Sequence, residues 1–190
     1  DLDYDTRSVN DYVKKLRKDA QEVGKKAAEK GTQIHDQIES GFKGFPNVPY
    51  KAVRACLSDL FPEVDDWVAE ESFCSQGGYG GKIDLYSPSA YIVVDFKTKE
   101  GIEGKEGKKL AYDEQGMQLA AYASGAEDWS DRGYDKRKEK EWGRVNLFID
   151  RNDTNIVIPH IWDEDAFERH IQMFLSLLSY WKVKNGMGEK

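Results

Sequence analysis

Cysteine is scarce in this 190-residue chain, which contains only Cys56 and Cys74. Two thiols cannot build a disulfide framework, and they cannot supply a cluster that needs four thiolate ligands. We therefore expect both cysteines to be reduced, and we expect an intracellular protein, in the cytoplasm or another reducing compartment.

Long hydrophobic runs are also missing. No apolar stretch approaches the roughly 18 residues that a membrane span requires. No positively charged start is followed by the apolar stretch of a secretory signal. Hydrophobic residues still make up 39% of the chain and aromatic residues 12%, which excludes a disordered chain. The length predicts a single domain, residues 1–190, with a real core and no membrane contact.

The chain has no excess of positive charge. It carries 28 basic and 35 acidic residues, which gives a formal net charge of −7. This balance argues against a passive nucleic-acid coat, which needs a basic surface. It does not exclude a metal-dependent nuclease, because bound cations neutralise an acidic site. The lysines that cluster at residues 14–18, 25–26, 105–109 and 136–140 form runs typical of solvated faces.

Hydrophobic periodicity and turn residues predict an α/β protein. The expected helices run from Ser8 or Asn10 to Val23, from Thr32 to Glu39, over 51–60, over 110–126, and from Asp163 or Asp165 through Trp181. The expected strands cover 67–73, with the alternating part over 68–74, and 80–86, 90–99, 144–150 and 155–162. Residues 127–142 form a polar insertion, and residues 100–109 form a mobile loop. This order favours a mixed central sheet with helices on both faces.

A β-hairpin from Gly80 to Lys99 is the centre of this pattern. Its second run is rich in β-branched and aromatic residues, and Ser87-Pro88-Ser89 marks the turn. Because side chains alternate along a strand, Asp95 and Lys97 share one face, and their apolar neighbours point into the core from the other.

The register of this hairpin determines where its acids meet. If Ser87 and Ala90 flank the turn, Asp84 lies opposite Val93 and diagonal to Asp95, roughly 7–8 Å away between Cα atoms. Two carboxylates so placed can share a divalent metal ion. The plainer alternative is a surface hairpin with scattered charges. Against it, Asp95 directly follows an apolar run, where an unpaired charge is costly to bury.

Two helical segments add further polar groups. His35, Ile38 and Glu39 share one helix face, and so do Gln118 and Tyr122. Taken alone, these residues suit ordinary packing or surface positions, and a tyrosine hydroxyl often serves as a polar handle.

The order of these groups changes their interpretation. The chain reads Gly31-Thr32-x-x-His35-x-x-Ile38-Glu39, then Gly81-Lys82-Ile83-Asp84, then Val94-Asp95-Phe96-Lys97-Thr98-Lys99, then Gln118-x-x-x-Tyr122. This series resembles the RecB-type branch of the PD-(D/E)XK nuclease superfamily, which includes CRISPR-associated exonucleases and the mitochondrial genome maintenance exonuclease. Four motifs in order cover about half of the chain. The resemblance implies a restriction-endonuclease-like core.

The resemblance also implies residue roles. His35, Asp84, Asp95 and the main-chain carbonyl of Phe96 are then metal ligands for Mg²⁺ or Mn²⁺, and Asp84 and Asp95 belong to the catalytic set. Lys97 is then the catalytic lysine. Gln118 and Tyr122 support that lysine and contact substrate.

Some positions stay open or depart from the pattern. The sequence leaves open whether Glu39, Glu70 or Glu71 joins the site. Asp95 stands where many members of the branch carry Glu. Iron–sulfur members need four cysteines, so that cluster is not expected here.

Two functions follow from different classes. The first is a metal-dependent deoxyribonuclease that hydrolyses DNA, single-stranded or with ends. We expect an exonuclease, because no helix-turn-helix or other base-reading module is visible. The second is a catalytically inactive scaffold or protein-binding module with a nuclease fold, which the negative charge would suit. The intact set of Asp84, Asp95 and Lys97 favours the enzyme. The loop from Glu100 to Lys109 is expected to border the DNA path.

Overall fold

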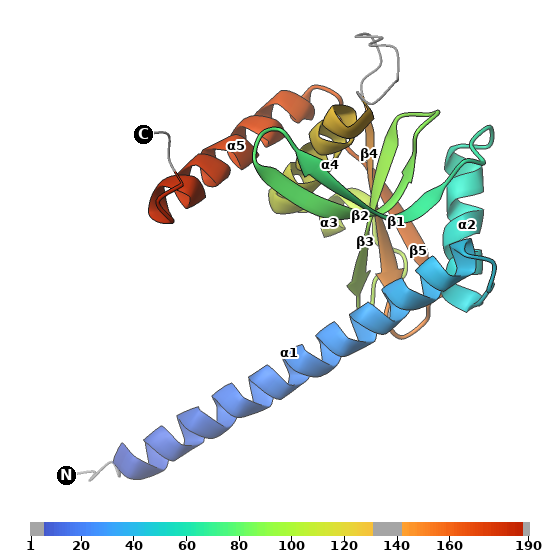
Figure 1. Cartoon of the computed structure of the whole chain (residues 1–190). Coiled ribbons are helices and arrows are strands. Elements are labelled where there is room, and N and C mark those ends of the chain that lie inside the picture. Colours follow the sequence, from blue (N-terminus) through green and yellow to red (C-terminus); the bar gives the residue numbers. More distant parts are fainter. Residues whose placement is uncertain (1–5, 131–141, 188–190) are drawn as a thin grey trace.

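A computed structural model describes residues 6–130 and 142–187 of the chain. Figure 1 shows a twisted sheet with helices on both faces. The helices are α1 (Thr6–Phe42), α2 (Val48–Leu60), α3 (Gly107–Leu110), α4 (Asp113–Ser130) and α5 (Ala166–Lys184). The strands are β1 (Val68–Ser75), β2 (Tyr79–Ser87), β3 (Ile92–Lys99), β4 (Gly143–Asp150) and β5 (Val157–Ile161).

The five strands lie in chain order, and the pairs are antiparallel except for β3 and β4, which are parallel. The end of α1 and all of α2 cover one face, over a core that includes Ile38, Leu57, Val94 and Phe96. On the other face, α4 packs over a second core that includes Val93 and joins α5 beside it (Figure 1). This arrangement confirms the predicted α/β fold with a mixed central sheet, including the inward direction of Val94 and Phe96.

The first helix differs from the prediction of two separate helices, because α1 runs without a break for 37 residues. Glycine within a helix costs only about 1 kcal/mol, so Gly24 and Gly31 do not end it. Gly31 has a packing reason instead: a Cβ there would lie 2.9 Å from the Thr98 hydroxyl. The missing side chain therefore lets α1 approach β3 closely.

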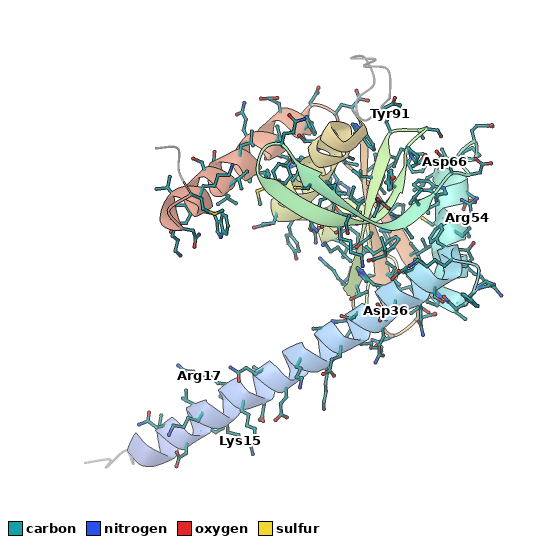
Figure 2. All side chains as sticks on the ribbon, viewed as in Figure 1. Lys15, Arg17, Asp36, Arg54, Asp66 and Tyr91 are labelled. Carbon is teal, nitrogen blue, oxygen red and sulfur yellow. The ribbon has the colours of Figure 1, made fainter. Side chains whose placement is uncertain are left out.

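The two ends of α1 lie in different surroundings. Residues 9–26 are all exposed, whereas Gly31, Ile34 and Ile38 are buried against the sheet. Figure 2 shows Lys15 and Arg17 on the part of the helix that projects away from the other elements.

The hairpin turn is longer than predicted. Ser87 pairs with Ile92 rather than with Ala90, so four residues form the loop. A polar network holds it, since the Ser87 hydroxyl donates to Asp66, the Ser89 amide donates to Asp66 Oδ2 over 2.9 Å, and the Ala90 amide donates to Ser87 Oγ over 3.1 Å. The predicted register was therefore wrong. Extended by one pair beyond Leu85 and Val94, where the pairing stops, the observed register brings Asp84 level with Asp95 instead of Val93.

The loop after β3 is more closely packed than the predicted mobile segment. Ile102 is fully buried, and its amide donates to Asp150 Oδ2 over 2.9 Å. The chain then forms α3 before α4 begins, so the predicted helix over 110–126 starts later and continues to Ser130. Of the predicted insertion over 127–142, residues 131–141 lie outside the described residues. Across the described ranges, the helices are too short or too polar for a membrane crossing.

Candidate active site

The sheet is interrupted on both sides of Asp84. Between β1 and β2 the pairing breaks at Glu70, which adopts a left-handed backbone with a φ of 61°. Between β2 and β3 the pairing stops at Leu85 and Val94. A non-glycine residue with positive φ is uncommon and is often found at functional sites. Asp84 therefore lies where its strand separates from both neighbours.

The Asp84 carboxylate occupies the gap between β2 and β3. Its Oδ2 accepts a hydrogen bond from the Phe96 amide over 2.7 Å, and the same oxygen lies 3.7 Å from His35 Nδ1. Burial raises the pKa of Asp84, although the Phe96 amide and nearby Lys97 oppose that rise. Asp84 thus joins β2, β3 and α1 at a single point.

Asp95 lies on β3 and is only 2% exposed. Its carboxylate contacts Lys97 Nζ over 2.9 and 3.0 Å, and its Oδ2 also accepts from Asn146 Nδ2 over 2.7 Å. Burial raises the pKa of Asp95 to about 6, with the Asp84 charge adding to the rise and Lys97 opposing it. Lys97 and Asn146 are therefore the partners that a buried carboxylate at this position needs.

Lys97 connects the acids to α4. Its Nζ donates to Gln118 Oε1 over 3.0 Å, and Gln118 Nε2 donates to the Tyr122 hydroxyl over 2.8 Å. An ammonium group has three N–H donors, and Asp95 and Gln118 take two of them. Lys97 is also one of the residues that line a surface cavity. The predicted support of Lys97 by Gln118 and Tyr122 matches this geometry.

His35 reaches the same place from α1. Its ring packs edge-on against the Phe96 ring, with the centroids 5.7 Å apart, and it hydrogen-bonds the Phe96 main chain. Burial lowers the pKa of His35, despite the opposing charge of Asp95. The neutral imidazole is the form that binds metals. Gly31, one turn earlier, permits the close approach of α1 that brings His35 here.

A cavity of about 540 Å³ opens beside these groups. It is lined by His35, Glu70, Phe96, Lys97 and Arg151, together with Ala27, Ala28, Gly31, Thr32, Asp36 and Thr98.

Of the three acids that the sequence left open, Glu70 lines this cavity, where it pairs with Lys82. Glu39 pairs instead with Lys43 on the next turn of α1. Glu71 pairs in register with Ile83 on β2. The cavity therefore favours Glu70 as the additional acid.

The donor set is suited to a hard divalent cation, although it is incomplete. In the described part of the chain, no three His, Cys, Asp or Glu side chains are gathered as a ready-made metal cage. Mg²⁺ rarely needs such a cage, because it commonly binds one or two carboxylates and keeps water and substrate phosphate as its other ligands. Asp84 and Asp95 are two such carboxylates, and the Phe96 carbonyl and His35 could add to them.

Two residues of the site were not predicted from the sequence. Asn146 is fully buried on β4, in register with Asp95, and its Oδ1 accepts from Trp162 Nε1 over 2.8 Å. Trp162 also packs edge-on against His170, with ring centroids 4.9 Å apart. An asparagine inside the apolar strand 144–150 was the available signal, because a buried amide needs partners.

Comparisons with known proteins are consistent with this fold. No family model matches the chain, and no curated protein matches it either. The crystal structure of a "putative exonuclease" from Eubacterium rectale matches with a TM-score of 0.51 and 15% sequence identity, over 86% of this chain and 69% of that one. The crystal structure of SSO0001 matches over 67% of this chain and 56% of that one, with 15% identity and a TM-score of 0.33, which is too low to support an argument. The chain therefore shares its fold with a nuclease-like structure.

Proposed function

We propose that this protein is a metal-dependent nuclease of the RecB type that hydrolyses phosphodiester bonds in DNA, and that it acts as an exonuclease. One observation carries the proposal: the Asp84 carboxylate binds the amide of Phe96, next in the chain to the buried Asp95, and Lys97 is fixed between Asp95 and Gln118. A surface hairpin with scattered charges would not gather two largely buried acids and a lysine in this way.

The chain's own residues have distinct tasks in this proposal. Asp84 and Asp95 would hold Mg²⁺ or Mn²⁺ together with the Phe96 carbonyl and His35. Such an ion lowers the pKa of bound water and offsets negative charge on the phosphate. Lys97 would supply an N–H donor that orients the attacking water or stabilises charge that develops in the transition state.

Gln118 and Tyr122 position Lys97. A lysine side chain has four flexible bonds, and the hydrogen bond to Gln118 limits their freedom. Tyr122 receives the other end of the amide and fixes its orientation. Burial raises the pKa of Tyr122, whose ordinary value already leaves the hydroxyl protonated at neutral pH. The hydrogen-bonded series of side chains that leads from Asp95 through Lys97 and Gln118 to Tyr122 would thus serve one task, the positioning of the lysine.

The test uses end-labelled single-stranded DNA, double-stranded DNA and RNA, each with EDTA, Mg²⁺ or Mn²⁺. We expect stepwise shortening of DNA from an end with either metal, none with EDTA, and loss of cleavage in Asp84→Asn. A circular single strand of the same length separates exonuclease from endonuclease activity. If the wild type is inert on every substrate with both metals, the scaffold alternative replaces the enzyme.

A further inference from the structure

A second cavity of about 530 Å³ has Gln118 and Tyr122 in its wall. Three elements form its walls: the hairpin of β1 and β2, the helix α4 and the helix α5 (Figure 1). We refer to it as the aromatic groove. It is lined by Phe73, Tyr79, Gly80, Glu114, Met117, Gln118, Ala121, Tyr122, Phe174, Leu177, Leu178, Tyr180 and Trp181.

The aromatic groove has a fixed floor and an exposed rim. On the floor, Tyr79 donates its hydroxyl to the Ala121 carbonyl over 3.1 Å and packs edge-on against Phe174, with centroids 4.7 Å apart. On the rim, Tyr180 is 64% exposed and Trp181 is 50% exposed. Rigid walls with open aromatic side chains above them offer stacking faces to a flat ligand.

The groove adjoins the hydrogen-bond network of the candidate active site. Gln118 and Tyr122 line the groove, and the same Gln118 accepts a hydrogen bond from Lys97. Only the Gln118 side chain would therefore separate the groove from a strand whose phosphate lies at Lys97.

Charge at the groove distinguishes bases from phosphates. Two lysines follow Trp181 on α5: Lys182, whose Nζ donates to the Gly77 carbonyl over 2.6 Å, and Lys184 in the last turn. Glu114 lies on the α4 wall, where its carboxylate would repel a phosphate. The apolar interior thus suits bases, while the lysines suit the phosphates that link them.

We propose that the aromatic groove binds the unpaired bases of a single-stranded nucleic acid whose backbone occupies the candidate active site. This inference rests on the proposed function and adds a substrate class, since stacking requires bases whose faces are free. Proteins that bind single strands commonly combine aromatic stacking platforms with a cationic path for the backbone.

The experiment measures binding without cleavage, in EDTA, by fluorescence anisotropy. One labelled oligonucleotide carries normal bases, and its partner has the same length and phosphates but abasic sugars near its end. Wild type should bind the normal strand more tightly. Trp181→Ala should lose roughly 5- to 100-fold of that affinity and bind the abasic strand unchanged. Trp181→Phe should restore most of the difference.

The matched control is Phe45→Ala, which removes another exposed aromatic ring, 72% exposed, from the loop between α1 and α2. It should bind both strands as the wild type does. Equal affinity of the wild type for normal and abasic strands would overturn the groove assignment, and metal-dependent cleavage in the same preparation would leave the nuclease proposal standing. Base-dependent binding without cleavage would support the groove assignment and contradict the nuclease proposal. Loss of a dimer in Trp181→Ala with unchanged strand binding would assign the groove to a second copy and overturn the inference.

Discussion

The two sides of β3 differ in how completely they are paired. On the β4 side the parallel register runs unbroken from Ile92 to Lys99. On the β2 side the antiparallel pairing covers only Ile92 to Val94. We call the β4 side closed and the β2 side open. On the closed side, Asn146 donates a hydrogen bond to Asp95. On the open side, the Asp84 carboxylate accepts a hydrogen bond from the Phe96 amide, beyond the end of the pairing.

This difference separates rigidity from access. The closed side fixes Asp95 within a continuous sheet, where close-packed neighbours limit its movement. The open side leaves a space between strands that a cavity and His35 border. A site that binds a polymer needs both properties, and here one strand receives each from a different neighbour.

The largest expected effect comes from Lys97, which links Asp95 to Gln118. Lys97→Ala should slow cleavage roughly 10²- to 10³-fold, about 2.7–4 kcal/mol, because it removes a charge aimed at the transition state. DNA affinity should stay near that of wild type. Lys99→Ala is the matched control, since Lys99 lies on the same face and binds the Leu110 carbonyl instead. Equal activity of the Lys97 and Lys99 variants would contradict the assignment.

Metal-free stability should reveal the burial of Asp95. A carboxyl whose pKa is raised from 3.8 to about 6 binds its proton more tightly in the folded state. The free energy of unfolding should therefore fall as pH rises through this range, by about 3 kcal/mol in total.

Urea denaturation in EDTA from pH 4 to pH 8 checks this expectation. The Asp95→Asn variant should lack this part of the pH dependence and should gain stability relative to wild type as pH rises. If the free energies of unfolding of the two proteins changed with pH in parallel, Asp95 would not be the source of this pH dependence.

The closed side can be weakened at Asn146. Asn146→Leu removes the hydrogen bonds to Asp95 and Trp162. Because the Asp95 carboxylate and the Trp162 indole N–H then lose this partner, the free energy of unfolding should fall by about 1–3 kcal/mol. Trp162→Phe removes only the indole donor, so it should cost less and preserve the contact to Asp95. Chemical denaturation of both variants, together with their Mn²⁺ affinities, compares the two. The Asn146 variant should lose more Mn²⁺ affinity than the Trp162 variant, and the reverse result would contradict this expectation.

The smallest effect is expected from the lysines beyond β3. Replacing Lys105, Lys108 and Lys109 with alanine should weaken DNA binding a few-fold at low salt, since exposed charges near a backbone each contribute roughly 1 kcal/mol or less. Replacing Lys14, Lys15 and Lys18 on the projecting part of α1 provides a control with the same charge change. DNA titrations at two salt concentrations measure both. Unchanged affinity after the loop substitutions would remove this segment from the DNA path.

Local pattern was enough to predict much of this structure. The alternation that placed Asp95 and Lys97 on one face depends only on strand geometry, and the spacing of Gln118 and Tyr122 depends only on the helix turn. The hairpin register could not be obtained this way, because Asp66, distant in sequence, lengthens the turn through Ser87 and Ser89.

Other features depended on contacts between distant segments. Nothing local shows that Asn146 on β4 pairs with Asp95, since parallel neighbours are joined by a long crossover. The need for glycine at position 31 likewise depends on the approach of Thr98. Positions set by a strand or helix period were predictable, whereas positions set by tertiary partners were not.

The uneven surroundings of α1 have a consequence for hydrogen exchange. Its backbone bonds are formed by one continuous helix, yet residues 9–26 lie in solvent and Ile34 and Ile38 lie in the core. An unpacked helix segment opens with little free energy, while a packed one opens only with the structure around it. Amides of the projecting part should exchange within seconds to minutes, and those around Ile38 should approach the protection of β4. The same helix would then report local opening at one end and global unfolding at the other.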